Sequence, residues 1–302
     1  MKINWNDLIQ KVIFISLTGF GVLGNIILFV RHVYTFIMGP ENKNIDVILI
    51  HLAFVNTIII CCIGVRTIAM SFYIRNFLDD VGCKTIIYVE RVARGLSICS
   101  TCLLSMVQAV TISPRTILWR KLKPQTAWPV LAFLLLFWIF NSLISSNLLH
   151  YITLGISMNR SVVGMFTGYC YMLPSRNTVK WLFLSLMTLR DVIFQSLMGW
   201  SSGSMALHLY KHHKRVLYLH SSRSTNNSRP EIRATQRVLT LMTCFLIFHL
   251  ADFIFSLYTG STVTNDFTIP NMKALLVLSY AGLSPFVLIS WDVHIAKTCC
   301  VP

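Results

Sequence analysis

Seven stretches of the chain are each long and apolar enough to cross a lipid bilayer, and this feature limits the fold more than any other. They lie near residues 8–34, 46–70, 85–111, 126–150, 179–209, 236–259 and 272–291. A bilayer core of about 30 Å needs roughly 20 apolar residues in a helix. Only 12% of the residues are charged, whereas soluble domains carry about 25%. The pattern predicts an all-α membrane protein, a single domain over residues 1–302 built as a seven-transmembrane helix bundle.

Lys and Arg residues are distributed unevenly between the segments that connect these stretches. The segments that follow the first, third, fifth and seventh stretches carry more of them than the segments on the opposite side. Basic residues collect on the cytoplasmic side of membrane proteins, so the asymmetry predicts an amino terminus outside the cell and a cytoplasmic carboxyl terminus. The net charge of +15 then reflects membrane topology rather than binding to nucleic acid. We expect a multi-pass protein of the plasma membrane.

Two of the nine cysteines, Cys83 and Cys170, fall in segments expected to face outward. Disulfides persist in oxidising compartments, so these two cysteines are predicted to join the top of the third helix to the second outer loop. The same loop carries a sequon at Asn159, which is a candidate glycosylation site. On the opposite side, Cys299 and Cys300 near the end of the chain are candidates for palmitoylation.

Four long motifs read RVARGLSICSTCLLSMVQAVTISP (91–114), LRDVIFQSLMGWSSGSMALHLYKHHKRV (189–216), RPEIRATQRVLTL (229–241) and LSPFVLISWD (283–292). Together they closely resemble the vomeronasal type 1 receptors, a family of mammalian pheromone receptors, and the likeness covers essentially the whole chain. The resemblance implies a G-protein-coupled receptor for small pheromone-like or odorant molecules, which activates a heterotrimeric G protein of the inhibitory class. It also implies that the usual Asp-Arg-Tyr and Asn-Pro-x-x-Tyr signatures are missing. This chain agrees, with SMVQAV and LSPFVLI in their places.

A polar stripe runs along the third apolar stretch at spacings of three and four residues, which places its members on one helix face. The stripe must face away from lipid, because a charge at the membrane centre costs at least about 2.5–3.5 kcal/mol. One interpretation is a structural seam of interhelical hydrogen bonds, in which Glu90 also pairs with Arg94. The other is ligand contact at the outer end, where bundle receptors open a cavity. The candidate ligand residues of the stripe are Glu90, Arg94, Ser97 and Thr101, and Ser105 and Gln108 continue it inward.

Further charges lie within the fifth and sixth stretches. Arg190 and Asp191 are neighbours, and adjacent helical residues do not share a face, so each is expected to pair with a different helix. Asp252 lies in the segment FHLADFIF, which is more polar than the resemblance leads us to expect. It either binds a cation or accepts a hydrogen bond from ligand, or it pairs with a neighbouring arginine such as Arg94 or Arg190. His249, one turn away, is expected to be a packing residue. Asp191 and Asp252 complete the candidate ligand set.

The segments expected to face the cytoplasm are basic, and the longest of them is also rich in serine. A basic, polar connector is first a positive-inside feature and a disordered link. In a seven-helix receptor it also lies beside the crevice that opens on activation, so it is a candidate docking surface for a G protein. The residues predicted to face that partner are Arg115, Arg120, Lys121, Lys211, Lys214, Arg215, Arg233 and Arg237.

Two other classes of protein compete with a receptor. A secondary transporter of small molecules is the principal alternative, and it predicts repeated halves with broken helices near the midplane; no repeat is evident in the sequence. A membrane enzyme needs a catalytic cluster such as paired carboxylates or a zinc motif, and none is evident either. We therefore expect no enzymatic activity, no cofactor and no metal site. The expected partners are a small molecule, a G protein and the lipid bilayer.

Overall fold

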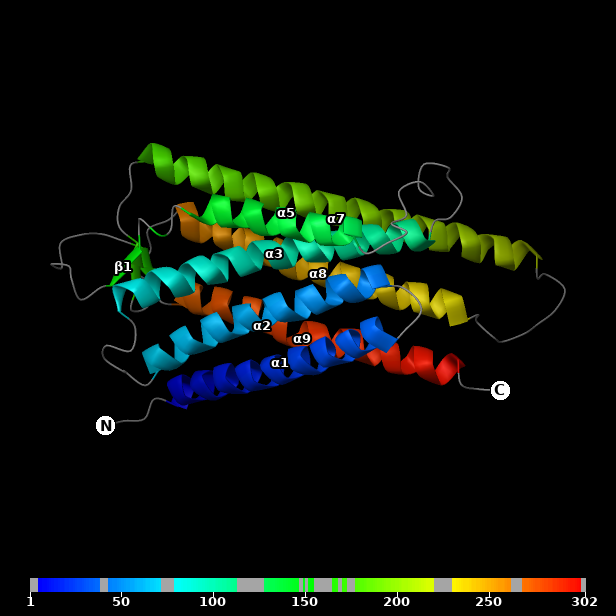
Figure 1. The fold of residues 1–302 in the computed structure, drawn as a ribbon, viewed down its shortest axis with the longest axis horizontal. Helices are drawn as coiled ribbons and strands as arrows, with labels where there is room; N and C mark the ends of the chain where they lie inside the picture. The colour runs from blue at the N-terminus through cyan, green and yellow to red at the C-terminus, as the bar shows by residue number, and fades with distance from the viewer. Residues whose placement is uncertain are drawn as a thin grey trace.

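The computed structural model describes residues 5–38, 43–71, 79–112, 128–146, 149, 152–154, 165–167, 170–172, 177–219, 230–261 and 268–299. At some helical positions it describes the backbone alone. Within these ranges seven long helices run side by side as a bundle (Figure 1). They are α1 (Trp5–Met38), α2 (Lys43–Ser71), α3 (Asp80–Ile112), α5 (Trp128–Ser145), α7 (Asn177–Leu219), α8 (Pro230–Ser261) and α9 (Thr268–Cys299). The end of the bundle at which α1 begins is called here the N-terminal end, and α9 finishes at the opposite end.

The predicted helix bundle is confirmed, and the helices differ from the seven apolar stretches chiefly at their ends. Five of them, α1, α2, α3, α5 and α7, are long and apolar enough to cross a membrane. In α8 and α9 the described apolar stretches are shorter, Met242–Tyr258 and Met272–Leu288. An apolar stretch in the sequence ends where the lipid is expected to end, whereas a helix can continue into water. For this reason α7 runs to Leu219, although its apolar stretch was expected to end near residue 209.

The fourth apolar stretch gives a helix shorter than expected. We predicted it to end near residue 150, and α5 ends at Ser145. There the Ser146 amide donates to the Leu143 carbonyl at 3.2 Å, and the Ser146 hydroxyl donates to the same oxygen at 2.8 Å. A serine that bonds a nearby backbone carbonyl offers the chain an alternative to the helical hydrogen-bond pattern. The helix stops at this turn although apolar residues follow.

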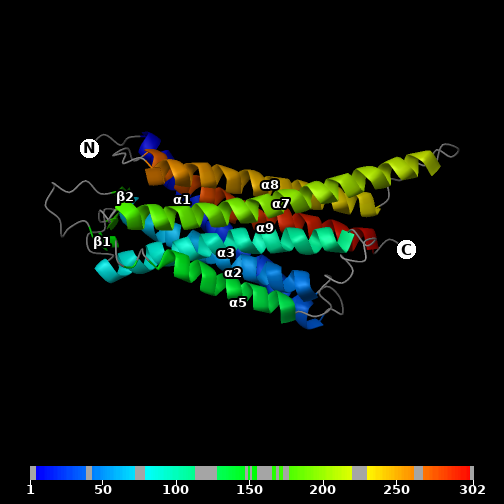
Figure 2. The same ribbon diagram turned by 90° about the horizontal axis from the view of Figure 1, so that it is seen from above.

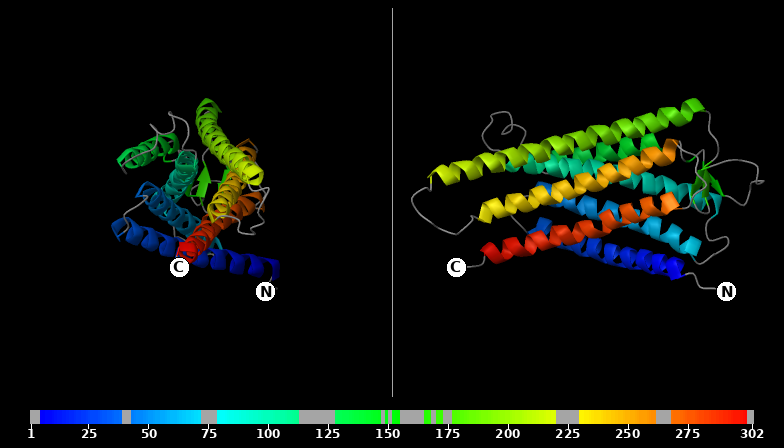
Figure 3. Two further views of the ribbon diagram at one scale, coloured as in Figure 1. Left: turned by 90° about the vertical axis from the view of Figure 1, so that its right-hand side faces the viewer. Right: turned by 180° about the vertical axis from the view of Figure 1, so that it is seen from behind.

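The third helix lies in the interior of the bundle. It contacts α2, α5, α7 and α8, and the end-on view shows the other helices around it (Figure 3). Of its membrane-length window 83% is buried, against 28% for α1, α5 and α7. The view from above shows α3 lying between α5 and the pair formed by α7 and α8 (Figure 2). The polar stripe of the third stretch therefore faces protein, because little of α3 faces outward.

A small antiparallel sheet joins the helices at the N-terminal end of the bundle (Figure 1). Its strands are β1 (Ile152–Leu154), β2 (Met165–Thr167) and β3 (Cys170–Met172), in the order β1-β3-β2. Leu154 and Thr167 both lie opposite Cys170. We expected a purely helical protein, and the sheet corrects that expectation. Strands of three residues are too short to show the alternation that identifies a strand in sequence.

Candidate functional site

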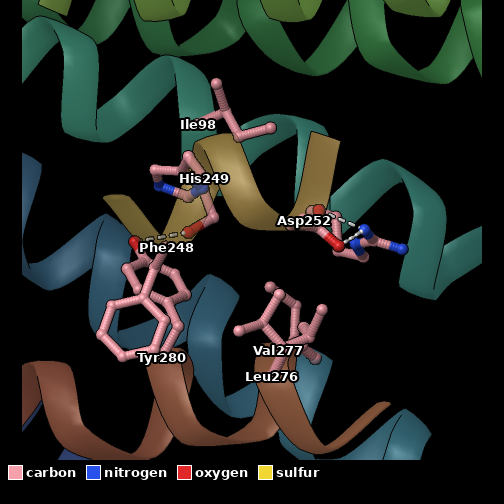
Figure 4. Close-up of a pocket in the computed structure, with 10 residues that line it drawn as sticks. Ile98, Phe248, His249, Asp252, Leu276, Val277 and Tyr280 are labelled. Carbon is pink, nitrogen blue, oxygen red and sulfur yellow. Dashed lines mark hydrogen bonds and ion pairs between the residues drawn. The ribbon is translucent and has the colours of Figure 1, made fainter. Parts of the chain in front are cut away.

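A pocket lies between α2, α3, α8 and α9, on the inner face of each helix. The space that atoms leave unfilled there is about 300 Å³, and part of it is open to solvent. Aliphatic and aromatic side chains form most of its wall, and a smaller set of polar groups converges on it, as in most sites for small organic molecules. The lining residues are Ile59, Arg94, Ser97, Ile98, Phe248, His249, Asp252, Leu276, Val277 and Tyr280. Figure 4 shows His249 and Asp252 projecting from α8 toward this space, with Tyr280 and Val277 facing them from α9.

Arg94 and Asp252 form the charged part of the pocket wall. The Arg94 Nη2 donates to both carboxylate oxygens of Asp252, and the side chains are 12% and 13% exposed. The same nitrogen donates to the Ser256 hydroxyl at 3.4 Å. This pair confirms the interpretation in which Asp252 binds Arg94. It also ties α3 to α8 across the pocket, so any movement of α8 away from α3 must break it.

A chain of hydrogen bonds leads from the pocket into α9. The Ser97 hydroxyl donates to the Asn56 side-chain oxygen at 3.1 Å and lies 3.1 Å from the Tyr280 hydroxyl. Because Ser97 has a single proton, Tyr280 is the donor in the second bond. The Asn56 amide nitrogen then donates to the Ser284 hydroxyl at 3.1 Å. Ser284 immediately precedes Pro285, which lies inside α9. Proline removes a helical hydrogen bond and is a common site of helix bending.

His249 lies at the inner end of the pocket, where it packs against neighbouring side chains. It is 5% exposed, and its Nε2 lies 3.3 Å from the Thr101 hydroxyl. Its ring centroid is 4.6 Å from that of Tyr280, and its carbonyl accepts a bond from the Gln195 amide at 3.2 Å. The packing role predicted for His249 is confirmed by these contacts. The residue nevertheless lines the pocket, which sequence reasoning did not anticipate.

Glu90 does not pair with Arg94 as we expected. Its Oε2 accepts a hydrogen bond from Arg66 Nη1 of α2 at 2.5 Å, while Arg94 binds Asp252. Sequence spacing could identify a partner for Glu90 only on its own helix, four residues away at Arg94. In the bundle each charge finds a partner on a neighbouring helix instead. Arg66 was missed because it lies at the end of an apolar stretch, where a basic residue usually marks the membrane surface.

Arg190 and Asp191 correct a second expectation, because they bind each other. The Arg190 Nε and Nη2 donate to Asp191 Oδ1 at 2.8 and 2.7 Å. The Cα–Cβ directions of adjacent residues do diverge, but an arginine side chain is long enough to turn back. The remaining nitrogen, Nη1, donates to Asn141 Oδ1 of α5 at 2.9 Å. The motif therefore joins α7 to α5 beside α3.

Gly95 makes room for this contact on the central helix. A Cβ at this position would overlap both Asn141 Oδ1 and Arg190 Nη1. Asn141 cannot retreat freely, since its amide nitrogen donates to the Phe137 carbonyl at 2.8 Å. The arginine of α7 and the asparagine of α5 can thus meet over α3 only while residue 95 has no side chain.

We expect Gly95→Ala to destabilise the receptor by about 1–3 kcal/mol, the usual cost of inserting a carbon into a packed core. The measurement is thermal unfolding of purified receptor, together with cell-surface amount. Gly203→Ala on α7 is the matched control, because no atom lies within 4 Å of its added carbon, and it should be neutral or slightly stabilising. Equal behaviour of the two variants would contradict the close approach at Gly95.

The structure brings half of the predicted ligand residues to the pocket. Arg94, Ser97 and Asp252 line it. Glu90, Thr101 and Asp191 lie elsewhere in the buried polar network, with the partners described above. Phe248, His249 and Tyr280 were missed as pocket residues. These side chains are aromatic and wholly or partly apolar, and such residues are equally common in a pocket wall and in an ordinary packed core, so the sequence alone could not tell the two apart.

The other predicted sites fall mainly at the edges of the described structure. Cys83 is disulfide-bonded, and Cys170 begins β3, but the side chain of Cys170 is not described. Lys211 and Lys214 are exposed on α7. Of Arg215, Arg233, Arg237 and Cys299 only the backbone is described, and Arg115, Arg120, Lys121, Asn159 and Cys300 lie outside the described residues.

Seven long helices side by side, with polar and aromatic groups converging on a pocket between four of them, form the architecture of the seven-helix membrane receptors. Within that class, residues 8–301 match the model of the vomeronasal organ pheromone receptor family. The chain therefore belongs to this family, whose members are chemosensory receptors of the G-protein-coupled type in the plasma membrane.

Individual relatives agree over nearly the full length of the chain. It is 32% identical to human vomeronasal type-1 receptor 4 over 285 residues, which covers 94% of this chain and 95% of the relative. It is 31% identical to rat vomeronasal type-1 receptor 100, covering 95% of this chain and 89% of the relative. It is also 32% identical to mouse vomeronasal type-1 receptor 51, over 94% and 89% of the two chains.

Proposed function

We propose that this receptor binds a small pheromone-like or odorant molecule in the pocket between α2, α3, α8 and α9 and then activates a heterotrimeric G protein of the inhibitory class. The observation that carries the proposal is the connection of the pocket to Pro285. Ser97 and Tyr280 both line the pocket and both belong to the hydrogen-bond chain that ends at Ser284. A ligand that competes for either hydroxyl changes the bonding next to a proline in α9. Ligand binding can shift a conformational equilibrium only through such differential contacts.

The distribution of charge and cysteine supports an extracellular N-terminal end and a cytoplasmic opposite end. Cys83 is disulfide-bonded and lies at the start of α3, at the N-terminal end of the bundle. Since disulfides form in oxidising compartments, this end faces outward in the proposal. Lys211 and Lys214 are exposed toward the other end, where α7 extends beyond its neighbours (Figure 2). This extension and the nearby basic segments form the proposed G-protein surface.

The buried amide of Gln108 supports an opening near that surface. Neither its oxygen nor its nitrogen has a hydrogen-bond partner among the described residues, and the residue is only 4% exposed. A buried polar group without a partner costs about 1–3 kcal/mol. Separation of the helices around the inner part of α3 would give this amide water or a partner backbone to bind. In the proposed active arrangement the helices separate around Gln108, and the free-energy cost of its unpaired amide in the closed bundle is removed.

The direct test is ligand-evoked GTP exchange in membranes that contain the full chain and an inhibitory-class G protein, screened with volatile and steroid compounds. We expect exchange in the presence of an active compound. Tyr280→Phe, which removes one hydroxyl from the hydrogen-bond chain between Tyr280 and Ser284, should lower maximal exchange about fivefold to thirtyfold, the effect of one to two kcal/mol. Tyr34→Phe on the exposed face of α1 is the matched control. Transport of labelled compound without GTP exchange would refute the proposal.

A further inference from the structure

The hydroxyl and amide groups beside the pocket form a chain in which the direction of each hydrogen bond is determined. Ser284 donates its one proton to the Ala281 carbonyl at 3.3 Å, so the Asn56 side chain must present its amide nitrogen to that hydroxyl. The Asn56 oxygen therefore faces Ser97, which donates to it at 3.1 Å. With that proton used, Ser97 accepts from the Tyr280 hydroxyl. The protons of these groups are thus assigned from α9 to α3.

The same reasoning fixes the tautomer of His249. The Thr101 hydroxyl donates its only proton to the Ser97 carbonyl, one turn earlier in α3. It must therefore accept from His249, whose Nε2 lies 3.3 Å away. The imidazole is neutral, because no carboxylate among the described residues forms an ion pair with it; Asp252 is bound by Arg94, and buried charges are normally paired. A neutral imidazole that donates through Nε2 carries a lone pair and no proton at Nδ1.

This Nδ1 atom of His249 is an acceptor without a donor. It forms no hydrogen bond with any residue that the structure describes, although the side chain is only 5% exposed. Unlike the amide atoms of Gln108, it is not fully enclosed by protein. His249 lines the pocket and projects into it from α8 (Figure 4), so the open side of Nδ1 is pocket space. A molecule that fills the pocket without a donor leaves this acceptor buried and unpaired, which costs free energy.

The charged pair of the pocket wall lies at the other end of the pocket. On α8, Asp252 follows His249 by three residues, about one turn nearer the N-terminal end. A ketone or an ether can therefore approach the Arg94 guanidinium at that outer end, but it has no proton to give to Nδ1 at the inner end. A hydroxyl group has both a proton and lone pairs. The inner end of the pocket thus distinguishes an alcohol from an ether of the same size.

We infer that the pocket selects molecules with a hydroxyl group, whose O–H donates to His249 Nδ1 while an apolar body lies against Ile98, Phe248 and Val277. The inference rests on the proposed function, since it names the chemistry of the molecule that occupies that pocket. His249 is the specificity-determining residue. Thr101 does not line the pocket and acts through His249, because it holds the ring in the tautomer that accepts at Nδ1.

The test uses purified full-length receptor in lipid nanodiscs and two isomeric probes, octan-1-ol and 1-methoxyheptane, of which only the first has an O–H donor. Affinity is obtained from the shift in thermal unfolding with probe concentration. The alcohol-to-ether ratio of affinities is compared between variants, so that unequal partitioning of the probes into lipid cancels. We expect this ratio to be about threefold to tenfold higher in the wild type than in His249→Phe, the usual effect of one neutral hydrogen bond.

His249→Phe retains a ring against Tyr280, 4.6 Å from it in the wild type, but has no acceptor. Thr101→Val removes the group that accepts from Nε2, so the proton can move to Nδ1 and the ring can then bind a ligand acceptor. This variant should lower the ratio by a similar factor without contacting the ligand. Thr57→Val is the matched control, because the Thr57 hydroxyl also donates to the carbonyl one turn earlier, at 2.8 Å. It should keep the wild-type ratio.

Three results would overturn the inference. They are equal ratios in the wild type and His249→Phe (including no detectable binding of either probe), an unchanged ratio in Thr101→Val, and an equal loss in Thr57→Val. GTP exchange separates this inference from the proposed function. An alcohol preference that depends on His249, without exchange evoked by any hydroxyl compound, would leave the inference standing and count against the function. Exchange evoked only by compounds without an O–H group would do the reverse.

Discussion

Asp252→Asn should reduce the receptor at the cell surface to less than about a tenth of the wild-type amount, because removing one partner of a buried ion pair costs about 3–5 kcal/mol. The variant leaves the Arg94 guanidinium inside the bundle without the carboxylate to which it donates. Native proteins are stable by only about 5–15 kcal/mol, so this loss is a large part of the total. The measurement is antibody binding, on intact cells, to an epitope at the amino terminus of the receptor, which the proposed orientation places outside, compared with total protein.

Two further variants test the physical cause. The double variant Arg94→Gln with Asp252→Asn contains no unpaired charge at these two positions and should recover most of the lost surface protein. Asp80→Asn removes one partner of the exposed Lys84–Asp80 pair, whose side chains are 32% and 44% exposed. Exposed pairs contribute about 0–1 kcal/mol, so this control should reach the surface normally. Normal delivery of Asp252→Asn, or a double variant worse than the single one, would disprove the role of the pair.

Cys83→Ser and Cys170→Ser should each lower the stability of the receptor by about 2–5 kcal/mol, and the double variant should lose no more than either one. Cys83 is disulfide-bonded, and Cys170 starts the strand that pairs with β1, which in turn contacts α3. A bridge between the two would fasten the small sheet to α3. Peptide mapping without reduction identifies the bonded partner directly.

Cys244→Ser provides the control for the loss of a thiol, since Cys244 is free and exposed on α8. This substitution should leave unfolding temperature and surface amount nearly unchanged. Additive losses in the Cys83 and Cys170 variants would mean that the two cysteines act separately. In that case the partner of Cys83 lies elsewhere in the chain.

The positions of the helices and the inward direction of the polar stripe could be predicted from sequence, because both depend on local pattern. Ser97 and Gln108 are buried, as their spacing on α3 indicated. The partners of the charges could not be predicted in the same way. Spacing places Glu90 beside Arg94, but it contains no information about the Arg66 side chain that approaches from α2. Such pairings are decided by which helices lie side by side.

The pocket illustrates the same limit. Its polar members lie on helices that are far apart in the chain: Asp252 follows Arg94 by 158 positions. Phe248 and Tyr280 are aromatic residues in apolar helices, and their sequence context resembles that of any core aromatic. The prediction for Arg190 and Asp191 was wrong because backbone direction was considered without the reach of the side chain.

The ion pair between Arg94 of α3 and Asp252 of α8 cannot form until both residues have been synthesised, so Arg94 remains without this partner for some time. Arg94 enters the membrane with α3, but its carboxylate partner lies 158 positions later in the chain. At a synthesis rate of about 5–20 residues per second, Asp252 follows roughly 8 to 32 s after Arg94. Through that interval a charged side chain must be sheltered by the insertion machinery, by water or by lipid headgroups. The assembly of this receptor therefore passes through an intermediate in which Arg94 has no carboxylate partner. That intermediate depends on the insertion machinery, water or lipid headgroups, none of which contacts Arg94 through this ion pair in the folded bundle.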